Sequence, residues 1–334
     1  MNKFIINAIA ATAFAWSAML GSVAQAELRS ITIGTNPSGS TFYLIGSGIA
    51  KMYQEKLRVR SNVQPQVGSS VYLPMINSGE LTLGLASSMD SYFSYTGDGF
   101  PAESKELRAL ANIWVLPYTF IVRRDSGIKT MEDLKGKRVM GDMPTNVALT
   151  RLNRAMLRSG GLSSDDVDFT KSGGLIDGIK AVVDGRADAA PVATTMPQLI
   201  EANSSVDGGI AIVANGTQAV DGYYEGEVPG TRVGMVAPND RQLFISEETA
   251  IVNYDTLFIA GTAMSDDDAY RLTKTLYENW PDLQKDYPPL RGVSQEQLLQ
   301  ADPSIPYHPG AIRFYKEIGA WTDAHDDKQT KLLQ

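Results

Sequence analysis

Residues 31–43, Ile-Thr-Ile-Gly-Thr-Asn-Pro-Ser-Gly-Ser-Thr-Phe-Tyr, decide how this chain folds. The β-branched run at 31–33 predicts a strand, which Gly34 ends in a loop of proline, glycine and hydroxyl residues. Apolar residues then recur with helical spacing across 42–53. A strand that passes through such a loop into a helix turns free backbone N–H groups toward one point. That point favours an anion or a carboxylate, so the segment predicts ligand capture.

Residues 1–26 have the features of a secretory signal peptide. Lys3 supplies a positive charge, residues 4–20 are largely apolar, and Ala24-Gln25-Ala26 is a small-residue cleavage site. An anchoring helix is the weaker interpretation, because the uninterrupted apolar stretch is short. We therefore expect a periplasmic protein whose mature chain begins near Glu27.

The composition excludes several classes of function. The 334 residues include no cysteine, which excludes disulfides, thiolate metal sites, cysteine nucleophiles and a lipid anchor on an N-terminal cysteine. The net charge of −8, without a basic run, gives no support for binding nucleic acid or anionic lipid. A hydrophobic content of 43% argues against disorder, and the length favours two domains.

Strand-like and helix-like segments alternate along most of the chain, which is the α/β pattern. The expected strands cover residues 30–35, 63–68, 81–86, 107–113, 119–124, 138–141, 167–171, 187–192 and 209–214. The expected helices cover residues 41–57, 70–78, 89–96, 146–158, 174–184, 197–203, 269–283 and 310–321. Residues 215–250 are expected to be a long excursion, and residues 323–334 a charged, frayed tail.

Two segments, 73–83 and 179–189, share one layout of a helix end, a glycine cap and a strand. Gly185 stands in the second segment where Gly79 stands in the first. Any α/β unit turns from helix to strand in this way, so the likeness has an ordinary explanation. The alternative is a pair of similar lobes.

Two β-rich runs, 118–127 and 251–261, are interpreted as the outgoing and returning crossovers between such lobes. The predicted fold is therefore α/β and two-lobed, with two crossover strands. Lobe I is expected to combine residues 27–122 and 256–334, and lobe II to cover residues 123–255.

Catalytic equipment is missing from the sequence. The only two histidines, His308 and His325, lie near the C-terminus, in a turn and in the expected tail. No Gly-x-Ser-x-Gly elbow accompanies them, and no phosphate loop follows the glycines at 46–48. We expect no catalytic residue, no metal site and no cofactor, and hence no enzyme.

Four strand-end loops instead open helices, at residues 35–41, 68–72, 87–90 and 142–147. Ligands of open α/β sheets lie beyond the carboxyl ends of strands, where such loops converge. Each loop alone is an ordinary helix cap, but four of them in two lobes predict a cleft. Aromatic residues such as Trp114 are candidates for its walls, although core packing is the common role of a tryptophan.

Several motifs, in this order, give the chain a family resemblance. They are Thr32-Ile-Gly-Thr, Gly68-Ser-Ser-Val, Asn77-Ser-Gly-Glu-Leu-Thr-Leu, Leu107-Arg-Ala-Leu-Ala, Phe120-Ile-Val-Arg-Arg-Asp-Ser-Gly-Ile-Lys, Met131-Glu-Asp-Leu-Lys-Gly-Lys-Arg-Val and Pro306-Tyr-His-Pro-Gly-Ala-Ile-Arg-Phe-Tyr. Together they resemble the TAXI family, the solute receptors of one branch of TRAP transporters. The resemblance covers essentially the whole mature chain.

This resemblance implies a type II periplasmic binding protein fold, whose cleft closes on a small carboxylate or acidic amino acid such as glutamate or 2-oxoglutarate. It implies delivery of that ligand to TRAP membrane subunits, driven by an ion gradient. With Trp114 added from the aromatic residues, the expected ligand-binding residues are Thr35, Ser38, Gly39, Tyr43, Ser69, Ser70, Ser87, Ser88, Trp114, Thr145 and Asn146. The start of the 146–158 helix is expected to meet a ligand carboxylate when the lobes close.

The chain departs from the family pattern where a ligand would be recognised. Ser87, Met89 and Leu116 stand where the family commonly has glutamine, aspartate and an acidic residue, and Pro144-Thr-Asn-Val replaces a Gly-Ser-Gly-Thr type helix opening. This loss of acidic groups favours an anion over an ammonium group. A periplasmic ligand sensor, an exported enzyme and an adhesin or scaffold remain alternatives at this stage.

Overall fold

The computed structural model describes residue 28 and residues 30–300 and 302–334, so the expected signal peptide at 1–26 lies outside the described residues. The helices are α1 (Thr41–Leu57), α2 (Ser69–Asn77), α3 (Ser88–Thr96), α4 (Val147–Ser159), α5 (Leu175–Val183), α6 (Gln198–Ser205), α7 (Tyr223–Glu227), α8 (Asp266–Glu278), α9 (Trp280–Asp286), α10 (Pro309–Glu317) and α11 (Asp323–Leu332). The strands are β1 (Ser30–Thr35), β2 (Arg60–Pro65), β3 (Leu83–Ser87), β4 (Leu107–Arg123), β5 (Arg138–Asp142), β6 (Asp168–Lys171), β7 (Ala189–Ala193), β8 (Ile210–Ile212), β9 (Thr231–Val236) and β10 (Thr249–Gly261).

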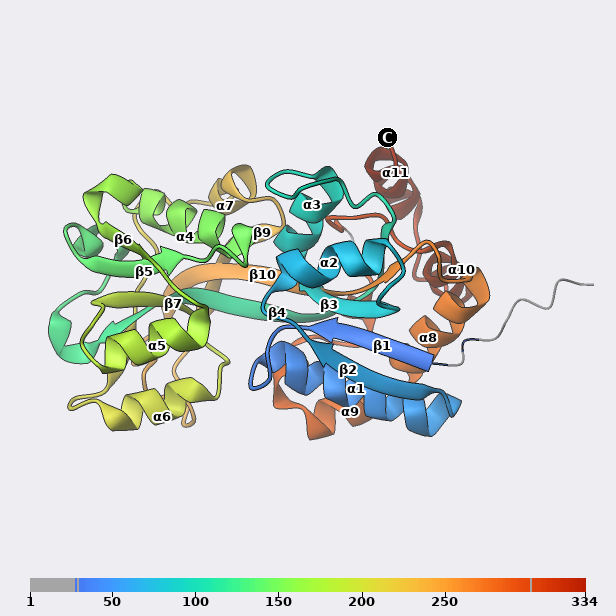
Figure 1. The fold of residues 1–334 in the computed structure, drawn as a ribbon, viewed down its shortest axis with the longest axis horizontal. Coiled ribbons are helices and arrows are strands. Elements are labelled where there is room, and N and C mark those ends of the chain that lie inside the picture. Colours follow the sequence, from blue (N-terminus) through green and yellow to red (C-terminus); the bar gives the residue numbers. More distant parts are fainter. Residues whose placement is uncertain (1–27, 29, 301) are drawn as a thin grey trace, which may run out of the picture.

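Two bodies lie side by side in Figure 1, joined by the long strands β4 and β10. The strands pair in the order β2-β1-β3-β10-β4-β7-β5-β6. We call the body of β1–β3 with α1–α3 and α8–α11 lobe I, and the body of β5–β8 with α4–α7 lobe II. Within each lobe the short strands pair in parallel, whereas β4 and β10 pair antiparallel with each other. The predicted two-lobed α/β fold with two crossover strands is confirmed, and the predicted boundaries between lobes stay a prediction.

The opening segment folds as its residue pattern predicts. Ile31 and Ile33 of β1 point into the core and are fully buried. The Ser40 hydroxyl begins α1 by accepting a hydrogen bond from the Tyr43 backbone N–H at 3.2 Å. A capping oxygen of this kind stabilises a helix start by about 1 kcal/mol. The loop between β1 and α1 is therefore held at the carboxyl end of its strand, where a ligand would approach.

The crossover β4 is one strand, so the prediction of separate strands at 107–113 and 119–124 was wrong. Residues 114–118 keep their pairing with β10 through Pro117 opposite Asn253 and Tyr118 opposite Val252. Pro117 lacks an N–H, but its carbonyl accepts a hydrogen bond from Thr194 at 2.9 Å, so no turn is needed there.

Three segments of the second half differ from their predictions. The helix expected at 269–283 is two helices: α8 ends at the cap residue Asn279, and α9 begins at Trp280 with Pro281 in its first turn. The excursion at 215–250 contains α7 and β9, and β9 pairs with β10. The expected tail is helix α11, whose Gln329 side chain hydrogen-bonds both backbone polar groups of Tyr307, at 2.8 and 3.0 Å.

The two similar segments of the sequence do share one geometry. Gly79 follows α2 with a φ of 79°, and Gly185 follows α5 with a φ of 69°. Only glycine adopts this left-handed conformation without strain, and it lets each chain turn back toward the next strand. Each lobe therefore carries the same helix-to-strand unit.

Candidate ligand-binding site

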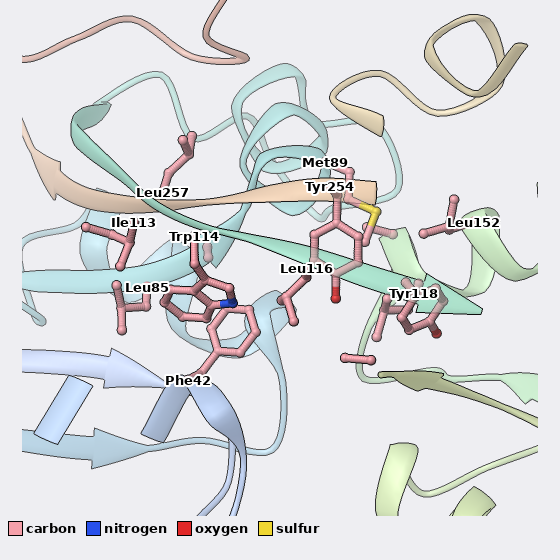
Figure 2. Packing of buried hydrophobic residues seen from close by; sticks show 14 of the residues in the cluster. Phe42, Leu85, Met89, Ile113, Trp114, Leu116, Tyr118, Leu152, Tyr254 and Leu257 are labelled. Carbon is pink, nitrogen blue, oxygen red and sulfur yellow. The ribbon is translucent and has the colours of Figure 1, made fainter. Parts of the chain in front are cut away.

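A cavity of about 390 Å³ lies between the lobes. Lobe I and the loops that open its helices contribute Asn36, Pro37, Ser40, Thr41, Phe42, Val67, Gly68, Ser87 and Asp90. The crossover strands contribute Leu116 from β4 and Tyr254 from β10, which Figure 2 shows beside each other. Lobe II contributes Met143, Thr145, Asn146, Leu149, Gly173, Gly174, Leu175, Ile176, Asp177, Lys180, Ala193 and Met196. Ten of these 23 residues have apolar side chains and three are glycines, so the cavity offers a ligand both apolar surface and polar groups.

Hydrogen bonds and an ion pair join the two lobes across the cleft. The Asn146 amide donates to the Ser69 hydroxyl at 3.2 Å, and the Gln198 amide donates to the Gly39 carbonyl at 2.9 Å. Arg151 of lobe II binds the Asp98 carboxylate of lobe I, with one N···O distance of 2.6 Å. The structure is therefore the closed arrangement of the two lobes.

The backbones of the two lobes approach each other closely at Gly68 and Thr145. Gly68, just before α2, packs so tightly on the Thr145 carbonyl that a Cβ atom at residue 68 would collide with it. The φ angle of Gly68 is 175°, an extended conformation that any residue adopts. The requirement for glycine at residue 68 therefore comes from the approach of lobe II and not from the local turn.

Five helices begin at the cavity wall. Side-chain oxygen atoms of Ser40, Ser87 and Asn146 cap α1, α3 and α4, whereas α2 and α5 follow Gly68 and Gly174 without a side-chain cap. Helix starts present backbone N–H groups and a partial positive charge. Their convergence favours a ligand with an anionic or acceptor group.

Asp90 is a buried carboxyl group on the wall, and its pKa is shifted upward. Its side chain is 4% exposed, and Oδ2 accepts a hydrogen bond from the Ser87 hydroxyl at 2.5 Å. Burial raises the pKa of Asp90 to about 6, although Ser87, Ser69 and Asn146 stand close enough to oppose the shift. No described residue hydrogen-bonds to Oδ1. The carboxyl group is therefore buried, with one of its two oxygen atoms unpaired among the described residues.

Charge on the opposite wall comes from α5. Lys180 is exposed, lines the cavity and makes no ion pair with the described residues. Asp177, one turn earlier, accepts a hydrogen bond from the Gly173 backbone N–H at 3.0 Å. The cavity wall therefore includes two carboxyl groups, Asp90 and Asp177. The sequence analysis inferred a loss of acidic groups from residues 89 and 116, and it did not consider these two carboxyl groups.

Three of the eleven predicted ligand-binding residues, Ser87, Thr145 and Asn146, lie on the cavity wall. The other eight lie behind or beside the wall: Thr35, Ser38, Gly39, Tyr43, Ser69, Ser70, Ser88 and Trp114.

Several of these eight have a different contact. Ser69 is buried and accepts the hydrogen bond from Asn146, and Gly39 accepts the one from Gln198. Ser88 donates to the Gly230 carbonyl at 2.7 Å. Trp114 is buried and packs edge-on against Phe42, with ring centroids 5.0 Å apart, as Figure 2 shows. These residues support the wall and the closure.

Sequence reasoning missed Asp90, Lys180 and Tyr254. Asp90 ends the Ser87-Ser-Met-Asp90 loop and has the spacing of a capping box, which concealed its place on the wall. Lys180 follows the paired glycines 173 and 174 by two helical turns, a signal that could have placed it near a helix start. Tyr254 carries no local signal, because its position depends on the return of β10.

The two histidines lie away from the cavity wall. His308 is buried and caps α10, where its Nδ1 accepts a hydrogen bond from the Gly310 N–H at 3.2 Å, and burial lowers its pKa. His325 lies in the first turn of α11 and stacks beside Trp321. Their contacts account for both residues as structural groups.

A model of the NMT1-like family matches residues 33–319, so the chain belongs to that family. Among the described residues, no helix combines the length and the apolar character needed to cross a membrane.

Solved structures that resemble the chain are distant. The alkanesulfonate-binding protein SsuA from Xanthomonas axonopodis pv. citri, bound to MOPS, is 16% identical over 90% of this chain and 83% of its own, with a TM-score of 0.49. PhnD1 from Prochlorococcus marinus (MIT 9301), in complex with methylphosphonate, is 12% identical over 87% and 90%, with a TM-score of 0.49. A putative L-cystine ABC transporter protein from Listeria monocytogenes is 14% identical over 78% and 95%, with a TM-score of 0.48.

Proposed function

We propose that this protein is a periplasmic solute receptor, which captures a small organic ligand between its lobes and delivers it to a membrane transporter. The observation that carries the proposal is the cavity between the lobes, on which residues from both lobes and both crossover strands converge. A cavity completed only when two lobes meet favours binding and release by domain closure.

The ligand class that we propose is a small organic anion, such as a carboxylate or an amino acid. Lys180 offers a cation, and the uncapped start of α5 at Gly174 offers backbone N–H groups on the same wall. The resemblance of the sequence motifs to TAXI receptors supports the same class. The apolar remainder of the wall adds affinity for the body of the ligand.

The membrane partner that we propose is the pair of TRAP membrane subunits. This partner rests on the motifs shared with TAXI receptors, which serve transporters of that kind. Uptake of the ligand by cells that express the receptor together with TRAP subunits tests the partner. If ligand uptake requires the receptor, the proposed TRAP partner is supported. If uptake is equal with and without the receptor, the proposed TRAP partner is contradicted.

Ligand binding itself is tested by thermal unfolding of the purified protein, refolded from denaturant to remove any ligand that co-purifies. Glutamate, 2-oxoglutarate, apolar amino acids and monocarboxylates form the panel. A ligand at a hundred times its dissociation constant stabilises the fold by about 2.7 kcal/mol, which raises the melting temperature by several degrees. A rise with one chemical class supports the proposal, and no rise with any organic anion contradicts it.

A further inference from the structure

Two buried oxygen atoms on the cavity wall have no hydrogen-bond partner among the described residues. They are Oδ1 of Asp90 and Oδ1 of Asn36. Buried polar atoms are otherwise nearly always paired, and an unpaired one costs about 1–3 kcal/mol. Both atoms accept hydrogen bonds in the orientation that the structure gives them. A donor that enters the cavity would satisfy them.

The other half of the Asp90 carboxyl is fixed in place. Its Oδ2 accepts a hydrogen bond from the Ser87 hydroxyl, and that hydroxyl in turn accepts one from the Asp90 backbone N–H at 2.9 Å. This reciprocal pair at the start of α3 holds the carboxyl group without help from a ligand. The free oxygen is thus part of a preformed wall, and not of a side chain that turns away.

Helix α8 begins with the same arrangement at a place away from the cavity. The Ser265 hydroxyl accepts from the Asp268 N–H at 3.0 Å and donates to Asp268 Oδ2 at 2.7 Å. There the second oxygen, Oδ1, faces the Arg271 guanidinium at 3.7 Å. At α3 no basic side chain takes the corresponding position beside Asp90. The comparison points to a missing donor or cation at the cavity.

A second carboxylate would be badly placed next to Asp90. Two like charges in a buried site repel strongly, because little water is present to screen them. The nearby polar groups are the side chains of Ser69, Ser87 and Asn146 and the phenols of three tyrosines, and none of them brings a positive charge. The tyrosines are Tyr72, Tyr118 and Tyr254. A hydroxyl or ammonium group would instead be attracted to the free oxygen atom.

We propose that Asp90 determines the specificity of this site: it selects an organic anion that also carries a hydroxyl or ammonium group, and it rejects dicarboxylates. The inference rests on the proposed function and narrows it. The ligand would place its anionic group toward Lys180 and α5, its apolar body along the wall, and its donor group beside Asp90.

Two sets of probes with matched skeletons test the assignment by titration calorimetry. The first set is hexanoate, 6-hydroxyhexanoate, 6-aminohexanoate and adipate, and the second is 4-methylpentanoate, 2-hydroxy-4-methylpentanoate and leucine. We expect wild-type protein to bind the hydroxy or amino member of at least one set about ten-fold or more tightly than the unsubstituted acid, the difference that one satisfied charged acceptor supplies. Adipate should bind most weakly of its set.

The variant Asp90→Asn keeps the size of the side chain and removes the charge, and it should erase the preference for the ammonium probes and improve binding of adipate. Asp90→Ala serves the same test if Asp90→Asn does not fold. Asp268→Asn is the matched control, because it alters the same kind of capping pair at α8, and it should keep the wild-type order of affinities.

Two results would overturn the assignment, and they differ. If Asp90→Asn binds the probes in the wild-type order, the carboxyl group serves only to cap α3 or to hold a water molecule, and the proposed receptor function stands. If wild-type protein binds none of the probes nor any other organic anion, the receptor function fails, and the role of Asp90 fails with it.

Discussion

The wall from lobe I holds its carboxyl group, Asp90, buried at the start of α3, whereas the wall from lobe II leaves its amine, Lys180, exposed on α5. Asp90 is fixed by Ser87, and Lys180 makes no ion pair with the described residues. This difference between Asp90 and Lys180 indicates different roles for the two lobes in ligand binding. Under the proposed function, lobe I recognises a donor group of the ligand through Asp90, and lobe II brings the charge of Lys180 to the ligand as the lobes close.

The largest effect that tests this comparison concerns Asp90 and stability. Because its folded-state pKa is raised from 3.8 to about 6, the folded protein binds more protons than the unfolded chain between these values. The contribution of Asp90 to stability is therefore most favourable below about pH 4, and it falls by up to about 3 kcal/mol as the pH rises through 6.

Asp90→Asn should remove this part of the pH dependence and make the protein more stable than wild type at pH 7. Denaturant unfolding of both proteins between pH 4 and 7 measures the difference. The control Asp268→Asn leaves Asp90 intact and should keep the slope. If the free energy of unfolding changes with pH in the same way for wild type and Asp90→Asn, the Asp90 carboxyl group is well solvated. That result would contradict its burial in the wall from lobe I.

The second effect concerns whether the two walls can meet. Gly68→Ala adds a methyl group against the Thr145 carbonyl, so closure must relieve a clash of about 1–3 kcal/mol. We expect affinity for the ligand to fall between about ten- and a hundred-fold, with little change in the melting temperature of the ligand-free protein. Gly292→Ala, where an added Cβ meets no atom within 4 Å, is the control. If Gly68→Ala binds the ligand as tightly as wild type, ligand binding does not require the close approach of the two lobes at Gly68.

The third effect concerns the charge on lobe II. Lys180→Gln removes an exposed cation, and exposed ion pairs contribute up to about 1 kcal/mol, so affinity should fall by up to about five-fold. The loss should shrink at high salt, because salt screens exposed charges. Lys51→Gln, which alters an exposed lysine on α1, should bind as wild type does. Equal affinities for Lys180→Gln and wild type at low salt would remove Lys180 from the site.

The smallest effect concerns the rim where the walls join. Asp98→Asn weakens the Arg151 ion pair between lobes, and affinity should fall by about two-fold. Asp188→Asn is a matched control, since Asp188 forms a two-pronged pair with Arg138, at 2.8 and 3.1 Å, within lobe II. That variant should change stability and leave affinity alone. A loss of affinity as large in Asp188→Asn would mean that the effect is not specific to closure.

Local patterns predicted much of the architecture. The strand at 30–35 and the helix at 41–57 have their predicted bounds, because β-branched residues, a glycine and a capping serine all act within a few residues. Asn146, which was predicted to bind ligand from a helix start at a strand end, lies on the cavity wall. Signals of this kind do not depend on distant parts of the chain.

Long-range contacts decided the rest. The local sequence around Asp90 showed only a helix cap. Its burial involves Tyr254 and Tyr118, which lie on the crossover strands and are distant in sequence. The last helix looked like a frayed tail because its order depends on Gln329 docking on Tyr307. Pairing with β10 likewise carried β4 straight through Pro117.

A crystal structure of the protein with the probe that stabilises it most tests the central claim most directly. We predict one ligand molecule in the cavity between the lobes, with its donor group beside Asp90 and its anionic group toward Lys180 and the start of α5. A ligand that lies outside the cavity, or that touches the wall of one lobe only, would contradict capture by closure.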